Sequence, residues 1–147
     1  MNDEQSTLES VGVILVTHAD YGSALLCAAE SIMGPLQDCC AISIDTNQTP
    51  EETANRLKDA VTRLDRGKGV ILLTDMFGGT PTNMSLSLIG THKVDVVTGV
   101  NLPMLLKIYA SRCRDLFELS SIARDAGIAG IVAAGEMLRS KVAPGKA

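Results

Sequence analysis

Two short apolar runs, each followed by a titratable side chain, constrain the fold of this chain most. The first covers residues 11–16 and leads into Thr17 and His18, and the second covers residues 69–74 and leads into Asp75. Apolar runs of this length, bounded by polar residues, are typical of the buried strands of a parallel sheet. In open α/β sheets, ligands bind outside the carboxyl ends of the strands. His18 and Asp75 are therefore expected at the edge of the sheet where a site would form.

Helical segments alternate with these strands. The clearest helix start is Thr49-Pro50-Glu51-Glu52, where threonine serves as N-cap, proline takes the first position and the second glutamate completes a capping box. Further strands are expected at residues 40–44 and 94–98. Helices are expected at residues 21–33, 50–66, 81–89 and 103–110, and over most of 116–141 with breaks near Gly127 and Gly130. The order predicts an α/β fold with an open, mainly parallel four-stranded sheet and helices on both faces.

Composition narrows the class of protein further. The 147 residues are enough for one domain with a real core, and 46% hydrophobic with only 3% aromatic residues predicts an aliphatic core. A net charge of −4 without a basic cluster argues against a nucleic-acid partner. No apolar stretch is long enough to cross a bilayer, and the first residues lack the features of a signal peptide, so we expect a cytoplasmic protein without membrane insertion. We expect a loose extension at 1–10, one domain at 11–140 and a flexible tail at 141–147.

The four cysteines and the second histidine are expected to carry no chemistry. The cysteines form no C-x-x-C pair and have no metal-like spacing, so we expect reduced, packed thiols and no metal site. The cysteines are Cys27, Cys39, Cys40 and Cys113. His92 lies in a polar connection before a strand, and we expect it to be exposed without function.

His18 is the candidate nucleophile or base at the strand ends. An imidazole can be a neutral nucleophile near neutral pH, and a carboxylate can hold the proton on its other nitrogen. Asp75, at the end of a neighbouring strand, is the first choice for that carboxylate. Asp20, close in sequence, is the second choice, and Asp45 also ends a strand. A hydrolase built on the same pair would need a second nucleophile, and the chain shows no G-x-S-x-G elbow.

A Gly78-Gly79-Thr80 turn follows Asp75 and opens a helix at Pro81. Glycines let backbone N–H groups approach an anion closely, and a helix start adds partial positive charge. The turn therefore predicts a site for a phosphoryl group beside His18. The simpler alternative is a tight connection after an Asx-turn, with Phe77 packed under the loop.

Three segments together resemble a known family. They are Val-Thr-His18-Ala-Asp, Leu-Thr-Asp75-Met-Phe-Gly-Gly-Thr80-Pro-Thr-Asn83 and Val-Thr-Gly99-Val-Asn101-Leu-Pro-Met104-Leu. In this order, over roughly residues 11–137, they resemble the enzyme IIA domain of the mannose class of the bacterial phosphoenolpyruvate:sugar phosphotransferase system. The segments around Asp75 and Asn101 are the specific ones.

The resemblance implies a function and a site. His18 would accept a phosphoryl group from the phosphocarrier HPr on Nε2 and pass it to an enzyme IIB, while Asp75 hydrogen-bonds the ring. The phosphate would be held by Gly78, Gly79 and Thr80, with the neighbouring Thr17 hydroxyl as a further candidate contact. Asn101 and Phe77 would shape the rim.

The resemblance also implies an architecture and leaves an alternative open. The sheet would have strand order 2-1-3-4, and the protein would be a homodimer with an extra edge strand that can be exchanged between subunits. Neither a cofactor nor a metal is implied, because phosphoryl transfer between two histidines requires neither. The alternative is a stand-alone regulatory phosphorelay module, whose state of phosphorylation at His18 controls a partner protein without sugar transport. A more distant resemblance is to the phosphotransferase subunit that serves dihydroxyacetone kinase.

Overall fold

The computed structural model describes residues 9–142. Most of the expected loose extension at 1–10 and of the flexible tail at 141–147 lies outside these residues. The four strands are β1 (Gly12–His18), β2 (Cys39–Ile44), β3 (Val70–Thr74) and β4 (Val94–Thr98). The helices are α1 (Tyr21–Met33), α2 (Pro50–Leu64), α3 (Thr80–Leu86), α4 (Leu102–Ala110), α5 (Leu116–Ala129) and α6 (Ala134–Val142).

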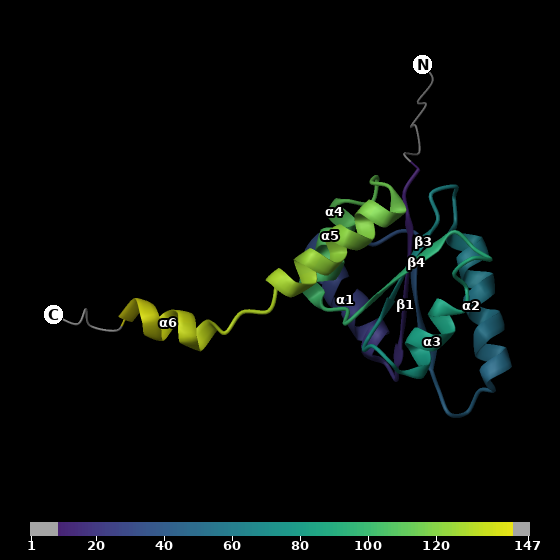
Figure 1. Ribbon diagram of the computed structural model, residues 1–147, viewed down its shortest axis with the longest axis horizontal. Helices are drawn as coiled ribbons and strands as arrows, with labels where there is room; N and C mark the ends of the chain where they lie inside the picture. Colours follow the sequence, from purple (N-terminus) through teal and green to yellow (C-terminus); the bar gives the residue numbers. More distant parts are fainter. Residues whose placement is uncertain (1–8, 143–147) are drawn as a thin grey trace, which may run out of the picture.

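The strands form one parallel sheet in the order β2-β1-β3-β4, which confirms the expected α/β fold. Alternate residues of β1 face opposite layers: Val13 and Leu15 pack with α1, α4 and α5, whereas Ile14 and Val16 pack with α2. Helices thus cover both faces of the sheet (Figure 1). Because both faces are buried, the central strands consist almost entirely of aliphatic residues.

Strand β1 runs two residues further than the apolar run predicts. Thr17 and His18 remain paired with Ser43 and Ile44 of the edge strand β2. His18 is therefore the last residue of the strand itself. Its backbone position is fixed by the sheet, whereas a residue on the following loop would be held less firmly.

The helix boundaries confirm the capping box and correct one expectation. Thr49 accepts a hydrogen bond from the Glu52 N–H, and the Glu52 side chain accepts one from the Thr49 N–H. The break expected near Gly127 is wrong, because Gly127 lies inside α5. A Cβ at this position would come within 2.8 Å of Met104 Cε, so the glycine allows α5 to pack closely on α4. The break falls at Gly130, which follows the last residue of α5.

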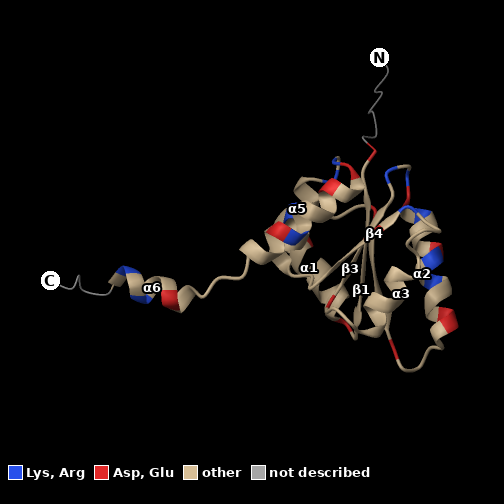
Figure 2. Cartoon of the chain, viewed as in Figure 1, with Lys and Arg blue, Asp and Glu red and all other residues tan. Residues whose placement is uncertain are grey.

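Charged residues are distributed unequally between the two ends of the sheet (Figure 2). The connections at the amino ends of the strands hold five cations, namely Arg66, Lys68, Lys93, Arg112 and Arg114. Arg112 also fastens this end, because its guanidinium donates to the carbonyl oxygens of Val11, Gln37 and Asp38. The four loops at the carboxyl ends carry Asp20, Asp45 and Asp75 and no Lys or Arg. The carboxyl edge is therefore acidic.

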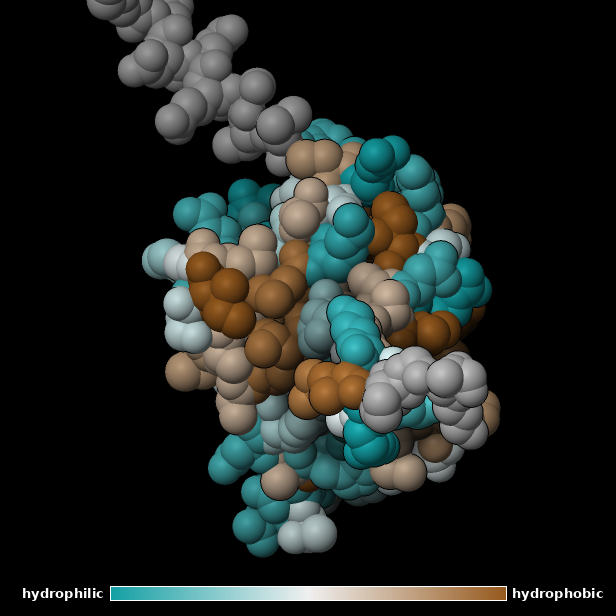
Figure 3. Space-filling model, turned by 90° about the vertical axis from the view of Figure 1, so that its left-hand side faces the viewer, coloured by the Kyte–Doolittle hydropathy of each residue, from teal (hydrophilic) through white to brown (hydrophobic). Residues whose placement is uncertain are grey.

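The C-terminal arm, residues 130–142, leaves the body of the molecule after α5 (Figure 1). No residue of α6 is buried, and Ile131 and Val132 in the connection are exposed. Figure 3 shows hydrophobic side chains gathered on this side of the molecule. Within residues 9–142 the sheet has four strands, so the expected exchangeable fifth strand is not formed in a single copy. None of the helices in this part of the chain has the length and apolar character needed to span a membrane.

Candidate active site

The structure brings His18 and Asp75 together at the carboxyl edge of the two central strands. The Oδ2 atom of Asp75 accepts the backbone N–H of His18 at 2.8 Å and lies 2.6 Å from Nδ1 of the same residue. The other carboxylate oxygen, Oδ1, accepts the N–H of Met76 at 2.9 Å. Both oxygens of Asp75 are thus engaged, and the carboxylate is held in one orientation.

The protonation state of Asp75 decides the tautomer of His18. Burial raises the pKa of Asp75, but the hydrogen bonds from the His18 backbone, the His18 ring and the Met76 N–H outweigh it, so the pKa is lowered. Asp75 is therefore an acceptor at neutral pH, and Nδ1 of His18 must carry the hydrogen that lies between them. The lone pair of the neutral ring is left on Nε2, and the His18 side chain as a whole is 52% exposed.

Neither of the two alternative carboxylates is hydrogen-bonded to the His18 ring. Asp20 is the N-cap residue of α1, and its side chain makes no capping hydrogen bond. Asp45 accepts the N–H of Asn47 within its own loop. Of the three aspartates considered, Asp75 is the one that contacts the His18 ring.

The Gly78-Gly79-Thr80 turn lies against the other side of the imidazole. Gly78 has φ +87°, a left-handed conformation that suits glycine. A Cβ on Gly79 would lie 3.2 Å from Cε1 and 3.8 Å from Nε2 of His18, a tight contact that glycine avoids where the backbone approaches the ring. Thr80 is the first residue of α3 and is exposed beside the turn. Gly79 thus lies beside the Cε1–Nε2 edge of the ring, which includes the nitrogen that carries the lone pair.

Two buried threonines, Thr74 and Thr82, stabilise the loop between β3 and α3 that bears Asp75. The sequence does not predict a role for either residue. Thr82 donates to the Met76 carbonyl at 2.6 Å, and Thr74 is hydrogen-bonded to the Thr82 hydroxyl at 2.8 Å. Because the Thr82 hydrogen is used on Met76, Thr74 is the donor of the second bond. This chain of hydrogen bonds links the end of β3 to the loop that bears Asp75. Threonine is so common at the ends of strands and in the first turn of helices that the sequence does not reveal these two hydrogen bonds.

Thr17 is placed differently from the candidate phosphate contacts. It is buried, and its hydroxyl accepts the Gly22 N–H at 2.8 Å and contacts the His18 carbonyl at 3.3 Å. The structure therefore places Thr17 beneath the loop between β1 and α1 and does not group it with the Gly78–Thr80 turn.

Asn101 and Tyr21 brace the neighbouring loop. Asn101 Oδ1 accepts the Met104 N–H as N-cap of α4, and its Nδ2 donates to the Gly127 carbonyl in α5. The Tyr21 hydroxyl donates to the Val100 carbonyl at 2.7 Å, which ties the start of α1 to the same loop. Asn101 thus supports the rim of the site through the backbone, with its amide occupied on both sides.

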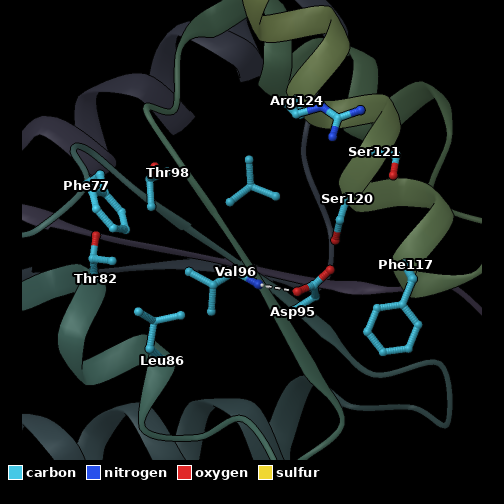
Figure 4. Close-up of a pocket in the computed structure, with 11 residues that line it drawn as sticks. Phe77, Thr82, Leu86, Asp95, Val96, Thr98, Phe117, Ser120, Ser121 and Arg124 are labelled. Carbon is cyan, nitrogen blue, oxygen red and sulfur yellow. Dashed lines mark hydrogen bonds between the residues drawn. The ribbon is translucent and has the colours of Figure 1, made fainter.

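Phe77 extends the site along the sheet edge. Its ring is 77% exposed, and it lines a groove of about 540 Å³ that runs over β4 between α3 and α5 (Figure 4). Phe117 and Arg124 line the groove from the α5 side. In the groove, Asp95 Oδ1 accepts the N–H of Val96 at 3.0 Å, so a side chain of β4 occupies a backbone donor of that strand.

His92, by contrast, precedes β4 at the opposite end of the strand, where its ring contacts Thr91.

Comparison with known proteins identifies the family. The sequence model of the family described as "PTS system fructose IIA component" matches residues 12–122, which include His18, Asp75 and the Gly78–Thr80 turn. The chain belongs to this family, the mannose-class EIIA proteins of the sugar phosphotransferase system.

Individual relatives agree with this EIIA assignment. The chain is 28% identical over 141 residues to the mannose-specific EIIAB component of Escherichia coli K12, a match that covers 94% of this chain and 44% of that protein. The chain therefore spans less than half the length of this relative. It is 38% identical over 100 residues to the sorbose-specific EIIA component of Lacticaseibacillus casei, covering 65% of this chain and 70% of the relative.

Solved EIIA structures share the fold. The mannose/sorbose-specific IIA subunit from Enterococcus faecalis superposes with a TM-score of 0.77 at 25% identity, covering 84% of this chain and 94% of that one. An EIIA component from Streptococcus agalactiae gives a TM-score of 0.78 at 26% identity, covering 86% of this chain and 98% of that one. Membership in the EIIA family supports a phosphotransfer role within the sugar phosphotransferase system.

Proposed function

We propose that this EIIA protein is a phosphoryl carrier that accepts a phosphoryl group on Nε2 of His18 from phospho-HPr and passes it to an enzyme IIB. The observation that carries the proposal is the contact between His18 Nδ1 and Asp75 Oδ2 at 2.6 Å. It keeps the hydrogen on Nδ1 and leaves the lone pair on Nε2, with Gly79 beside the Cε1–Nε2 edge of the ring. A histidine nucleophile needs this arrangement, in which a carboxylate binds one ring nitrogen and the other ring nitrogen is free to attack.

The proposed transfer exchanges one N–P bond for another. The Nε2 lone pair of His18 attacks the phosphorus, the new N–P bond forms, and the bond to the donor histidine breaks with its electron pair returning to the donor ring. The hydrogen stays on Nδ1, hydrogen-bonded to the Asp75 carboxylate, and this carboxylate stabilises the positive charge that the His18 ring acquires. The second transfer, to the acceptor protein, reverses these steps at His18 and regenerates the neutral ring.

The charges around His18 favour a carrier over a tight phosphate-binding site. The loops at the carboxyl edge offer glycine backbone and a threonine hydroxyl to the phosphoryl group, but no Lys or Arg. Phosphoryl transfer depends mainly on positioning and on compensation of negative charge. A site without a cation of its own binds the group weakly enough to release it. The exposed Phe77 ring next to the site gives a donor or acceptor protein an apolar surface to contact.

We further propose that the protein is a homodimer, built by exchange of the segment around Ile131 and Val132. These two β-branched side chains are exposed, and the segment leads away from its own domain. Strand β4 is an edge strand whose groove is open, so it can accept an added strand from a second copy. The Asp95 carboxylate would have to leave the Val96 N–H for that strand to pair along the whole edge. Sedimentation equilibrium measures this directly: a dimer is expected, and a monomer at high concentration contradicts it.

The carrier proposal is tested by phosphorylation in vitro. The protein is incubated with phosphoenolpyruvate, enzyme I and HPr, and its intact mass is measured with and without acid treatment. We expect one acid-labile phosphoryl group in the wild type and in His92→Ala, and none in His18→Ala. Labelling of His18→Ala, or no labelling of the wild type by an active donor, contradicts the proposal. Subsequent loss of the group on addition of an enzyme IIB distinguishes a carrier from a regulatory module, which would keep it.

A further inference from the structure

We propose that Ser43, on the edge strand β2, is a positioning residue for phosphoryl transfer at His18. Its hydroxyl donates to the Ala19 carbonyl at 2.6 Å and so holds the backbone directly after His18. The inference rests on the proposed function, because it concerns how the same histidine is aimed.

Ala19 has a backbone conformation that needs support. Its φ is +45°, one of two positive φ values at non-glycine residues in the described part of the chain. A residue with a Cβ disfavours this left-handed region, and such residues persist where the surrounding structure holds them. Ala19 lies between the end of β1 and the N-cap of α1, so the chain turns at this residue. The turn sets the direction of the peptide that follows His18.

Strand register brings Ser43 to this turn. Ser43 pairs with Thr17 and the next residue, Ile44, pairs with His18. The Thr17 hydroxyl accepts the Gly22 N–H on the near side of the turn, and the Ser43 hydroxyl binds the Ala19 carbonyl from the neighbouring strand. Both hydroxyls therefore fasten the same short loop, one from beneath it and one from the edge of the sheet.

The consequence for chemistry lies in the two contacts of His18. Asp75 Oδ2 receives both the backbone N–H and the ring of this residue, so a rotation of the peptide after His18 would move the ring relative to the carboxylate. On the other side, Gly79 leaves little space beside Cε1. The imidazole thus has a narrow range of productive positions, and small displacements of a reacting group lower rates strongly. Ser43 therefore limits the positions that the imidazole can take, without itself contacting the phosphoryl group.

The test compares matched serine variants. Ser43→Ala removes the hydroxyl at the turn, and Ser31→Ala removes a hydroxyl that donates to a backbone carbonyl in α1, away from the site. We expect Ser43→Ala to accept the phosphoryl group about tenfold more slowly, with a thermal midpoint within a few degrees of wild type, and Ser31→Ala to accept it at the wild-type rate. Ser43→Thr keeps a hydroxyl and is expected to keep most of the rate.

A second change addresses the backbone itself. Glycine adopts a positive φ without steric cost, so Ala19→Gly in the Ser43→Ala background is expected to restore the rate to within about threefold of wild type. A readout independent of phosphorylation is the ¹⁵N chemical shift of the His18 ring nitrogens. In Ser43→Ala we expect the Nδ1 and Nε2 signals to move closer together as the tautomer becomes mixed.

The outcomes separate this inference from the carrier proposal. If the wild type accepts no phosphoryl group, the proposed function fails, while the ring shifts still report on Ser43. If the wild type is phosphorylated and Ser43→Ala matches it in both rate and ring shifts, the inference is overturned. It is also overturned if Ser43→Thr loses as much rate as Ser43→Ala, because the hydroxyl would then not be the cause.

Discussion

A single oxygen of Asp75, Oδ2, accepts the backbone N–H of His18 at 2.8 Å and lies 2.6 Å from its Nδ1. The carboxylate therefore fixes both the end of β1 and the ring that projects from it. His18 ends β1 and Asp75 directly follows β3, the neighbouring strand, so strand pairing brings the two residues close together. The two hydrogen bonds of Oδ2 then fix their relative positions.

Replacing Asp75 by asparagine tests the electrostatic part of this relationship. Asp75→Asn retains the size of the side chain but cannot stabilise the charged ring formed during transfer. We expect phosphoryl acceptance to slow by about a hundredfold without being abolished, as measured by quench-flow with phospho-HPr. Wild-type rates in this variant would remove Asp75 from the mechanism.

The lowered pKa of Asp75 also predicts a pH dependence of stability. Its pKa in the folded protein lies below the value of about 3.9 for an unfolded chain. Ionised Asp75 thus contributes stability above the unfolded value, and this contribution is lost as the pH falls through the folded value. Urea denaturation should show wild type more stable than Asp75→Asn at pH 7, with the difference shrinking below about pH 4. An equal difference at pH 7 and pH 3 would contradict the direction of the shift.

Gly79→Ala tests the close approach of the turn to the imidazole. The backbone of Gly79 has φ −91°, which alanine adopts readily, so the expected effect is steric. The new Cβ would lie 3.2 Å from His18 Cε1, and the ring must shift to accommodate it. We expect phosphoryl acceptance to fall about tenfold or more, with the thermal midpoint within a few degrees of wild type. A variant with normal kinetics would show that the turn does not confine the ring.

Asn101→Ala tests whether this residue supports the site or acts in it. The substitution removes the N-cap of α4 and the bond to the Gly127 carbonyl. We expect a loss of about 1–2 kcal/mol in the free energy of unfolding, because capping residues contribute this much. Asn101→Asp keeps the capping oxygen but loses the donor to Gly127, and is expected to lose less. Phosphoryl acceptance at a temperature where both variants are folded should stay within about threefold of wild type, and a larger loss would place the amide in the reaction.

The sequence predicts the fold better than it predicts the details of the site. The strands could be located because both faces of the sheet are buried, which forces nearly continuous apolar runs at residues 11–16 and 69–74. His18 and Asp75 could be paired because parallel strands bring their carboxyl ends to one edge. The break predicted at Gly127 is wrong because a glycine that permits close helix packing and one that ends a helix look alike in the sequence. Its role depends on Met104, which lies on a different helix.

The supporting hydroxyl groups could not be predicted for a related reason. Thr74, Thr82 and Ser43 all act on backbone groups of loops that come from other parts of the chain. A hydroxyl has no preferred partner that a sequence pattern reveals, so its use follows only from register and loop geometry. Thr17 illustrates the same limit: its position next to His18 indicated a phosphate contact, whereas its side chain faces the Gly22 N–H.

The most direct test of the account is the position of the phosphoryl group on the ring. The protein, labelled with ¹⁵N at histidine, is phosphorylated by phosphoenolpyruvate, enzyme I and HPr, and its ring nitrogens are observed by long-range ¹H–¹⁵N correlation. The account predicts that phosphorus couples to Nε2 of His18 and that Nδ1 remains protonated beside Asp75. Coupling to Nδ1 of His18, or a phosphoryl group on another residue, would contradict it.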